Sequence, residues 1–283
     1  ALSASGNRGV TRQYPHTPGI DAAGVVEQST VSEFAPGDEV IVTGYDLGMN
    51  TAGGFGQYIR VPSAWLLKRP KGLALREAMM LGTAGLTAAL CVAKLEQAGL
   101  TPEAGTVLVT GATGGVGSFA VLLLARLGFQ VTAATGKASA ADYLRQLGAA
   151  EIISRDSLSA PGKPLAKEQW AGVVDSVGSH TLANACAQSR YGGVVAACGL
   201  AQGMDFPASV APFILRGITL CGIDSVMQPM APRLAAWAQL AELLTADDFT
   251  LLSQEISLAD AIPQAQALLA GDIQGRLLVN VNS

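Results

Sequence analysis

Histidine, charge and long apolar runs are all scarce in this chain of 283 residues. It has only two histidines, His16 and His180, and its four cysteines form no CxxC pair. Neither a common Cys/His zinc site nor a disulfide framework is therefore indicated, and we interpret the cysteines as small buried thiols. No run rich in lysine and arginine offers a footprint for nucleic acid, and the net charge is −4. The most apolar stretch, Phe119–Ala125, is far too short to span a bilayer.

The residues that are abundant indicate a globular chain with a large core. Hydrophobic residues make up 49% of the sequence and charged residues 14%, which does not favour disorder. The 33 glycines stand in short groups, as expected for tight turns between buried elements. The chain shows no signal peptide and opens on Ala1 without an initiator methionine. We expect it to begin inside a longer protein, in the cytoplasm, with neither nucleic acid nor membrane as a partner.

The pattern of apolar residues changes near position 75. Before it, turns rich in proline and glycine separate short strands, which we expect at 25–26, 39–42 and 57–61. A helix is expected over 75–99, interrupted at Gly82-Thr83, and from 106 short apolar runs alternate with helices. Continuous apolar strands between helices predict a parallel sheet covered on both faces. The fold class is therefore α/β, with a doubly wound domain at 84–222 inserted between 1–83 and 223–283.

The clearest motif is the turn Gly111-Ala-Thr-Gly-Gly-Val-Gly117, which follows an apolar strand and opens a helix. Such a turn lets backbone N–H groups approach a pyrophosphate, and the positive end of the helix dipole adds to the attraction. Ala112 departs from the strict GxGxxG fingerprint. The alternative is a glycine-rich turn in an unrelated α/β fold.

The end of the second strand of this domain indicates which dinucleotide binds. Proteins that bind NAD commonly carry an acid there, on the ribose hydroxyl. This chain has Thr135-Gly136-Lys137 instead, and Arg155 follows the third strand. A hydroxyl and a cation suit a 2′-phosphate, so NADP is favoured over NAD. The alternative for Lys137 is a solvated lysine at a helix start.

A second informative stretch is Pro18-Gly-Ile-Asp-Ala-Ala-Gly-Val-Val26. It resembles the Gly-His-Glu-x-x-Gly-x-Val element of zinc alcohol dehydrogenases, with Ile20 where the ligand histidine stands and Asp21 in place of the glutamate. Isoleucine cannot bind zinc. The resemblance therefore implies the zinc-free, quinone-oxidoreductase-like branch of the medium-chain dehydrogenase/reductase superfamily, and we expect no metal site.

The resemblance extends over nearly the whole chain. The matching segments are Tyr14-Pro-x-x-Pro-Gly-Ile-Asp21, Leu81-Gly-Thr-Ala-Gly-Leu-Thr87, Val109–Ser118, Tyr191–Leu200, Pro212–Arg216, Gly222–Met227 and Gln274-Gly-Arg276. Together they are similar to the YhdH/YhfP-type quinone oxidoreductases, also called the acrylyl-CoA reductase family. That family implies a GroES-like substrate domain with an inserted Rossmann domain, usually as a homodimer. It also implies NADPH-dependent reduction of an activated carbon–carbon double bond, with acryloyl-CoA as a substrate.

The resemblance also implies roles for individual residues. Those expected at the pyrophosphate are Thr113, Gly114, Gly115 and Val116, and those expected at the 2′-phosphate are Thr135, Gly136, Lys137 and Arg155. Lys137 keeps the charge of an arginine common in the family but loses the planar guanidinium. The remaining residues expected at the cofactor are Ser176, Leu220, Arg276 and Thr83. A family Asn-Tyr-Lys-Asp segment, which supplies a tyrosine near the nicotinamide, is expected just before Ala1.

The sequence leaves the chemistry of the acceptor open. No residue stands out as the proton donor: Asp21 is nearest by motif, although we favour a bracing role, and Thr83 suits a cofactor contact and a helix cap equally. The acceptor is a small enone, a quinone or an acyl-CoA, and Arg8 and Arg12 are candidates for meeting CoA. The alternatives are an NADPH:quinone oxidoreductase and, in another class, an NADPH-binding sensor or structural protein with little turnover.

Overall fold

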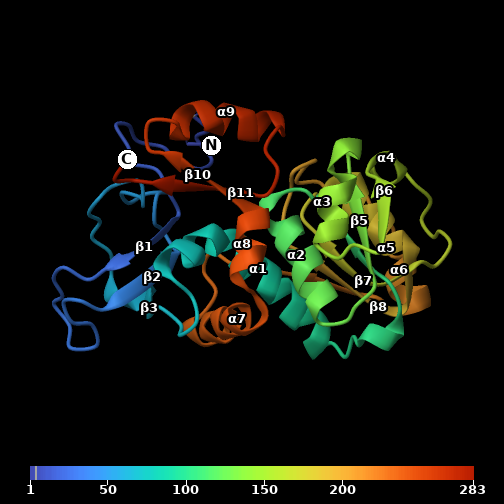
Figure 1. Ribbon diagram of the computed structural model, residues 1–283. Coiled ribbons are helices and arrows are strands. Elements are labelled where there is room, and N and C mark those ends of the chain that lie inside the picture. The colour runs from blue at the N-terminus through green and yellow to red at the C-terminus, as the bar shows by residue number, and fades with distance from the viewer. Residues whose placement is uncertain (4) are drawn as a thin grey trace. The chain divides into compact units, whose positions relative to one another are not determined.

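The computed structural model describes residues 1–3 and 5–283, which divide into two compact units. One unit comprises Ala1–Leu86 with Ser225–Ser283, and the other comprises Thr87–Asp224. The second therefore interrupts the first in sequence. Figure 1 labels the elements of both units along the chain.

The unit Thr87–Asp224 is built on a six-stranded sheet with the order β6-β5-β4-β7-β8-β9, all of whose neighbours pair in parallel. This confirms the expected α/β class with a doubly wound parallel sheet. The strands are β4 Val107–Val109, β5 Val131–Thr135, β6 Glu151–Ser154, β7 Trp170–Asp175, β8 Ser189–Ala197 and β9 Thr219–Gly222. The helices between them are α2 Gly115–Arg126, α3 Ala141–Gln146, α4 Asp156–Ser159, α5 Ser179–Gln188 and α6 Ala211–Arg216, with short 3-10 turns at Pro102–Ala104 and Ala138–Ala140.

Helices lie on both sides of this sheet (Figure 1). On one side α5 packs Leu182 and Cys186 into a core with Leu108, Val173 and Val195 of the central strands. Helix α2 is buried along most of its length, from residue 117 to 124. Strands covered on both faces must be apolar throughout, which is why β4 and β7 have entirely buried sequences.

The other unit contains a small antiparallel sheet and a parallel strand pair. Its strands are β1 Asp21–Val25, β2 Glu39–Thr43 and β3 Leu66–Lys68 in the order β1-β2-β3, together with β10 Ser253–Ser257 paired in parallel with β11 Arg276–Asn280. Its helices are the first part of α1 Leu75–Gln97, α7 Met230–Leu243, α8 Ala246–Leu252 and α9 Ala261–Ala270, with a 3-10 turn at Ser63–Trp65. The strand expected at Gln57–Val61 was wrong: Gln57 and Tyr58 form bends, residues 59–61 have no regular structure, and Tyr58 is 81% exposed.

Helix α1 has the length and composition of a membrane span, but 78% of its apolar window is buried in the protein. A core helix meets the same criteria, so this is weak evidence for a membrane. The helix is broken at Gly82, whose φ of 50° and ψ of −152° no ordinary residue adopts readily. The break confirms the interruption expected at Gly82-Thr83.

A buried arginine fixes the segment that returns to this unit after residue 224. Arg233 on α7 is 1% exposed, and its guanidinium donates to the carbonyls of Thr43, Ser225 and Val226. It also lies 4.3 Å over the ring of Tyr45. These bonds join β2 to the loop before α7, so the two separate stretches of this unit form one core.

Candidate functional site

The turn after β4 has the geometry of an anion site. Gly114 is the N-cap of α2 and provides no side-chain cap, so no side chain satisfies the first N–H groups of the helix at this position. A Cβ on Gly117 would lie 2.3 Å from the carbonyl oxygen of Gly111 and 2.7 Å from the Cα of Ala112. Only glycine therefore lets the helix begin so close to the turn. Gly115 and Val116, both expected at the pyrophosphate, lie in the first turn of α2.

Asp175 at the end of β7 holds this turn in place. Its carboxylate accepts a hydrogen bond from the Thr110 hydroxyl at 2.6 Å and from the Gly178 N–H at 2.8 Å. Burial raises the pKa of this carboxyl, and the same two bonds partly offset the rise. The Ser176 hydroxyl donates to the Thr110 carbonyl at 3.1 Å. These bonds join the ends of β4 and β7, where the order of the strands reverses and where open α/β sheets bind their ligands.

The residues expected at the 2′-phosphate meet at the ends of β5 and β6. The N–H of Arg155 donates to the Thr135 carbonyl at 2.9 Å, and the N–H of Lys137 donates to the Thr135 hydroxyl at 3.0 Å. The side chain of Arg155 lies against Gly136, where an added Cβ would be 2.5 Å from its Nε. The Thr113 hydroxyl is 3.4 Å from that of Thr135 and so connects this group to the turn. Two basic residues, Lys137 and Arg155, thus adjoin the Thr135 hydroxyl.

Leu220 is placed differently from these residues. It lies on β9 at the edge of the sheet and packs against the core cluster of Val173 and Val195. The structure therefore gives Leu220 a packing role, and its expected place beside the cofactor stays a prediction.

Thr83 and Arg276 belong to the other unit, where they gather around Asp21. The Asp21 carboxylate accepts the N–H of Thr83 at 3.0 Å and its hydroxyl at 2.5 Å. Arg276 lies 3.6 Å from the same carboxylate and also donates to the carbonyl of Met80 at 3.2 Å. The backbone at Gly82 lies directly against the Asp21 carboxylate, since a Cβ added there would be 2.5 Å from it. A glycine at this position therefore allows Asp21 to approach Thr83. This geometry gives Asp21 the bracing role that we favoured.

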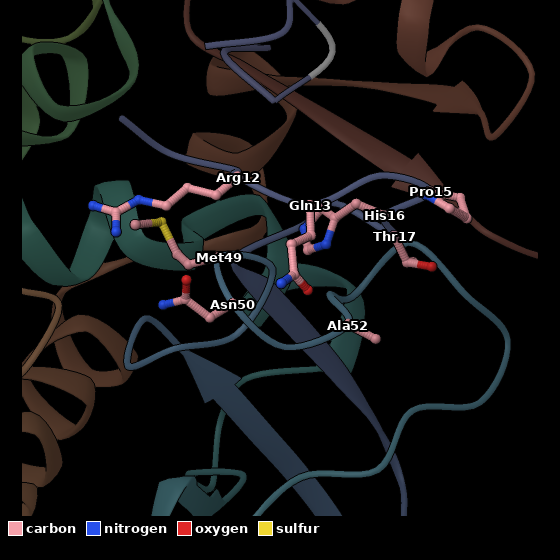
Figure 2. Close-up of a pocket in the computed structure, with 8 residues that line it drawn as sticks. All are labelled: Arg12, Gln13, Pro15, His16, Thr17, Met49, Asn50 and Ala52. Atoms are coloured by element: carbon pink, nitrogen blue, oxygen red, sulfur yellow. The ribbon is translucent and has the colours of Figure 1, made fainter. Parts of the chain in front are cut away.

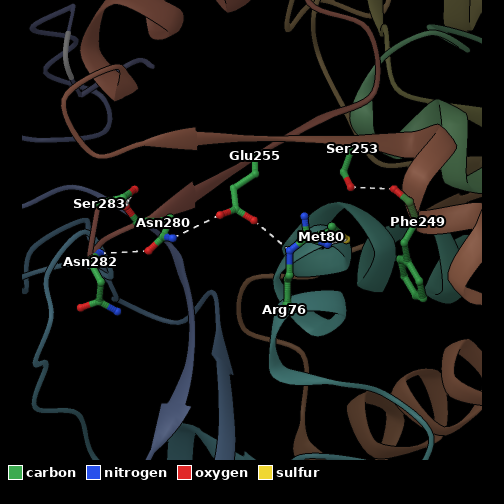
Figure 3. A network of polar contacts seen from close by, with 8 residues as sticks. All are labelled: Arg76, Met80, Phe249, Ser253, Glu255, Asn280, Asn282 and Ser283. Carbon is green, nitrogen blue, oxygen red and sulfur yellow. Dashed lines mark hydrogen bonds and ion pairs between the residues drawn. The ribbon is translucent and has the colours of Figure 1, made fainter.

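A second polar network attaches the strand of Arg276 to the start of α1 (Figure 3). Glu255 on β10 accepts hydrogen bonds from Arg76 at 2.8 Å and from Asn280 at 3.1 Å. The bond from Arg76, and then that from Asn280, lowers the pKa of Glu255. Because Asn280 and Arg276 share β11, this network helps to position the guanidinium of Arg276 beside Asp21.

The cysteines behave as buried or half-buried free thiols. Cys91 and Cys186 are buried, and Cys198 and Cys221 are partly buried. Burial raises the pKa of Cys186 to about 12, so it stays a neutral thiol at physiological pH. Within residues 1–3 and 5–283, no three His, Cys, Asp or Glu side chains gather in a group that could hold a metal ion.

Two parts of the structure were missed by sequence reasoning. The first is Asp175, whose only signal was an acid at the end of an apolar strand. The second is a cavity of about 430 Å³ that lies wholly within the unit of Ala1–Leu86 and Ser225–Ser283 (Figure 2). It is lined by Arg12, Gln13, Pro15, His16, Thr17, Met49, Asn50 and Ala52. Arg12, His16 and the segment that begins at Tyr14 were noted from the sequence, but nothing there indicated that they line a cavity with Met49, Asn50 and Ala52.

Comparisons with known proteins agree with this architecture. Residues 3–71 match the family described as alcohol dehydrogenase GroES-like domain, and residues 115–245 match zinc-binding dehydrogenase. Acrylyl-CoA reductase AcuI of Ruegeria pomeroyi is 49% identical over 276 residues, covering 97% of this chain and 84% of the relative. Putative quinone oxidoreductase YhfP of Bacillus subtilis is 50% identical over 283 residues, covering 99% of this chain and 85% of the relative.

Solved structures give the same result. The yhdH oxidoreductase of Salmonella enterica, in complex with NADP, superposes with a TM-score of 0.97 at 49% identity, covering 99% of this chain and 86% of the other. Bacillus subtilis yhfP, with NAD bound, gives a TM-score of 0.92 at 49% identity, covering 96% and 83%. The chain therefore belongs to the YhdH/YhfP-type family of quinone oxidoreductases and acrylyl-CoA reductases, within the medium-chain dehydrogenase/reductase superfamily.

Proposed function

We propose that the protein is an NADPH-dependent reductase of an activated carbon–carbon double bond in an enone or enoyl thioester, with acryloyl-CoA as the best single candidate. The observation that carries the proposal is the corner at the ends of β5 and β6, where Lys137 and Arg155 flank the Thr135 hydroxyl. A relative 49% identical to this chain is named acrylyl-CoA reductase, which supports the choice of acceptor.

The residues of the inserted unit fit a dinucleotide. The uncapped N-terminus of α2 and the close approach permitted by Gly117 suit a pyrophosphate, which Thr113, Gly114, Gly115 and Val116 would hold. Lys137 and Arg155 would hold a 2′-phosphate by charge-assisted hydrogen bonds. Two closely related structures contain NADP or NADPH and a third contains NAD, so the preference for NADP in this chain is argued from Lys137 and Arg155.

When bound, the nicotinamide supplies a hydride to the β-carbon of the acceptor. Reduction of a double bond beside a carbonyl builds negative charge on the carbonyl oxygen, which requires a fixed donor. In the unit of Ala1–Leu86 and Ser225–Ser283, Arg276 pairs with Asp21 and donates to the Met80 carbonyl, so its guanidinium is held in a fixed position. Thr83 is held by the same carboxylate. We assign these three residues to orienting the reactants and leave the proton donor unassigned.

An acceptor screen that follows NADPH absorbance at 340 nm tests this proposal. Acryloyl-CoA should be reduced with a higher kcat/KM than 1,4-benzoquinone. The reverse preference would select the NADPH:quinone oxidoreductase, which the name of the Bacillus relative favours. Tight NADPH binding without turnover of any acceptor would instead select a sensor or structural protein.

We also propose that the chemistry needs no zinc, although one matching family is described as zinc-binding. Ile20, 40% exposed just before β1, stands where the resemblance puts a ligand histidine, and isoleucine has no atom that binds zinc. Metal analysis of the purified active enzyme should find far less than one zinc per chain. One zinc per chain, with activity lost to a chelator, would overturn this.

We further propose a cytoplasmic homodimer in which 84–222 is the NADP-binding domain and 1–83 with 223–283 is the substrate domain. Strand β9 ends the sheet, and α6 beside it exposes Ile214 and Leu215, which are 73% and 63% exposed. A sheet edge next to apolar side chains suits a second copy of the chain. Light scattering should give twice the chain mass, and Ile214→Asp should reduce it.

A further inference from the structure

Ser118 ties the glycine-rich turn to the helix that follows it. Its side chain is fully buried at the start of α2, and its hydroxyl donates to the Ala112 carbonyl at 3.1 Å. Its N–H donates to the Gly114 carbonyl at 2.9 Å. On the other side, the Ala112 N–H donates to the Ala134 carbonyl of β5 at 3.2 Å. Ala112, which departs from the GxGxxG fingerprint, is therefore fixed at both its carbonyl and its N–H.

The bond from Ser118 sets the direction of one particular peptide group. The Ala112 carbonyl and the Thr113 N–H belong to the same planar trans peptide, in which the two groups point in opposite directions. Because the carbonyl faces Ser118 at the buried start of α2, the N–H faces away from it. Thr113 is only 8% exposed, yet its N–H donates to no acceptor within residues 1–3 and 5–283. An open donor beside a helix N-terminus is suited to an anion.

Tyr143 on α3 is the neighbour of Ser118. It is 8% exposed, and its hydroxyl is buried without a hydrogen bond of good geometry in the part of the chain that the structure describes. Burial raises the pKa of Tyr143, and the Ser118 hydroxyl beside it partly offsets the rise. A phenol has one proton to donate, and the Ser118 oxygen has lone pairs to accept it. Tyr143 can therefore donate to Ser118 while Ser118 donates to Ala112, and such chains of hydrogen bonds strengthen one another.

We propose that Ser118 and Tyr143 are positioning residues for the pyrophosphate of the cofactor. Ser118 orients the Ala112–Thr113 peptide so that its N–H meets a phosphate oxygen, and Tyr143 reinforces this orientation by donating to the Ser118 hydroxyl. Both act through the backbone of the turn, so they contribute equally to the binding of NADPH and NADH. The inference rests on the proposed dinucleotide site and is independent of the acceptor.

Ser118→Ala tests the proposal, with Ser189→Ala as its matched control. Both serines are buried in the same unit and both donate to a backbone carbonyl, Ser189 to that of Ala185 at 2.9 Å. Ser189 begins β8, at the edge of the parallel sheet opposite to the one where the strands end and the turn lies. Each substitution should lower stability to urea by a similar amount, because each removes one buried hydrogen bond.

Titration with three ligands separates positioning from general damage. Ser118→Ala should raise the Kd for NADPH and the Kd for NADH about tenfold each, the loss expected for one hydrogen bond. Its Kd for adenosine 2′-monophosphate, which has no pyrophosphate, should stay within about twofold of wild type. Ser189→Ala should leave all three constants within about twofold of wild type. A purely structural role of Ser118 would weaken the binding of all three ligands together.

Tyr143→Phe removes only the phenolic hydroxyl. Because this hydroxyl is buried and poorly paired, the variant should be at least as stable to urea as wild type, yet its Kd for NADPH should rise about threefold. In the Ser118→Ala background the same change should have no further effect on Kd, since Tyr143 acts through Ser118. Tyr143→Phe also tests the pair if Ser118→Ala does not fold.

The outcomes separate this inference from the proposed function. An unchanged Kd for NADPH in Ser118→Ala would overturn the inference, as would a tenfold loss for adenosine 2′-monophosphate. An unchanged Kd for NADPH in Tyr143→Phe, or an equal effect of this change in both backgrounds, would remove Tyr143 from it. Wild-type protein that binds no NADPH would contradict the inference and the proposed function together. Wild-type protein that binds NADPH but reduces no acceptor would contradict the proposed function alone.

Discussion

The position of Lys137 allows the choice of cofactor to be tested by one substitution. Its N–H is fixed to the Thr135 hydroxyl at 3.0 Å, directly after β5, and Arg155 lies against the neighbouring Gly136. Lys137→Asp reverses the charge at a defined point of this corner. It also restores the acid that NAD-binding proteins commonly carry at the end of this strand.

The size of the effect follows from two contributions. A hydrogen bond to a charged group contributes about 1.5–3 kcal/mol, and the lower value applies because Lys137 is only half-buried. Like charges about 4 Å apart repel by about 1–4 kcal/mol between water and a protein surface, so we take about 2 kcal/mol for aspartate facing the phosphate. The sum of about 3.5 kcal/mol corresponds to a rise in the Kd for NADPH of roughly 300-fold. NADH has no 2′-phosphate, so its Kd should change by less than about threefold.

Both dissociation constants can be measured by titrating the protein with NADPH or NADH and following the quenching of protein fluorescence. Lys163→Asp is the matched control, because Lys163 is an exposed lysine of the same unit and the charge change is identical. Its Kd for NADPH should stay close to that of wild type. Equal losses for NADPH and NADH in Lys137→Asp would refute the assignment, since they would indicate a damaged site. An unchanged Kd for NADPH would leave Arg155 as the only phosphate ligand.

Two further predictions concern stability. Gly82→Ala should lower the free energy of unfolding by at least about 2 kcal/mol, because a Cβ would lie 2.5 Å from the Asp21 carboxylate in a conformation that favours glycine. Gly99→Ala, with φ of +88° and nothing within 4 Å, should cost only about 1 kcal/mol in urea unfolding, and equal losses would argue against the close contact. Thr110→Val removes a donor from buried Asp175 and should cost about 1.5–3 kcal/mol at pH 7.5. Burial raises the pKa of Asp175, so the free energy of unfolding falls as pH rises through that pKa and the carboxyl ionises. Loss of the Thr110 donor raises the pKa of Asp175 further. The cost of Thr110→Val should therefore be smaller at pH 4.5, where Asp175 is more often protonated, than at pH 7.5. A cost independent of pH would show that the bond does not act on the ionised carboxylate.

The doubly wound sheet could be predicted from the sequence because its signal is local. Strands β4 and β7 are buried on both faces, so their residues form continuous apolar runs. The helices between them begin or end at glycines such as Gly115 and Gly148. Each element therefore has a sequence pattern of its own.

The unit of Ala1–Leu86 and Ser225–Ser283 was harder to predict because its strands depend on distant partners. Gln57–Val61 has the composition of a strand, yet no strand among residues 1–3 and 5–283 pairs with it, and Gln57 and Tyr58 form bends. The strand that pairs with β2 is β3, Leu66–Lys68, which lies further along the chain and has only three residues. Strand β10 pairs with β11 across the intervening helix α9 and includes polar residues such as Glu255. Pairing of this kind is set by tertiary contacts, which a single sequence does not display.

The same distinction applies to the residues of the predicted cofactor corner and to those of the cavity in the other unit. Thr135 and Arg155 are brought together by the sheet itself, because the ends of adjacent parallel strands share one edge. Knowing the strands is therefore enough to predict that these residues meet. Gln13 and Asn50 come from loops more than 30 residues apart, joined by a bond from His16 to a backbone carbonyl that has no sequence signal. Residues that the sheet itself brings together could therefore be predicted from the strands alone, whereas residues that meet only through loop contacts could not.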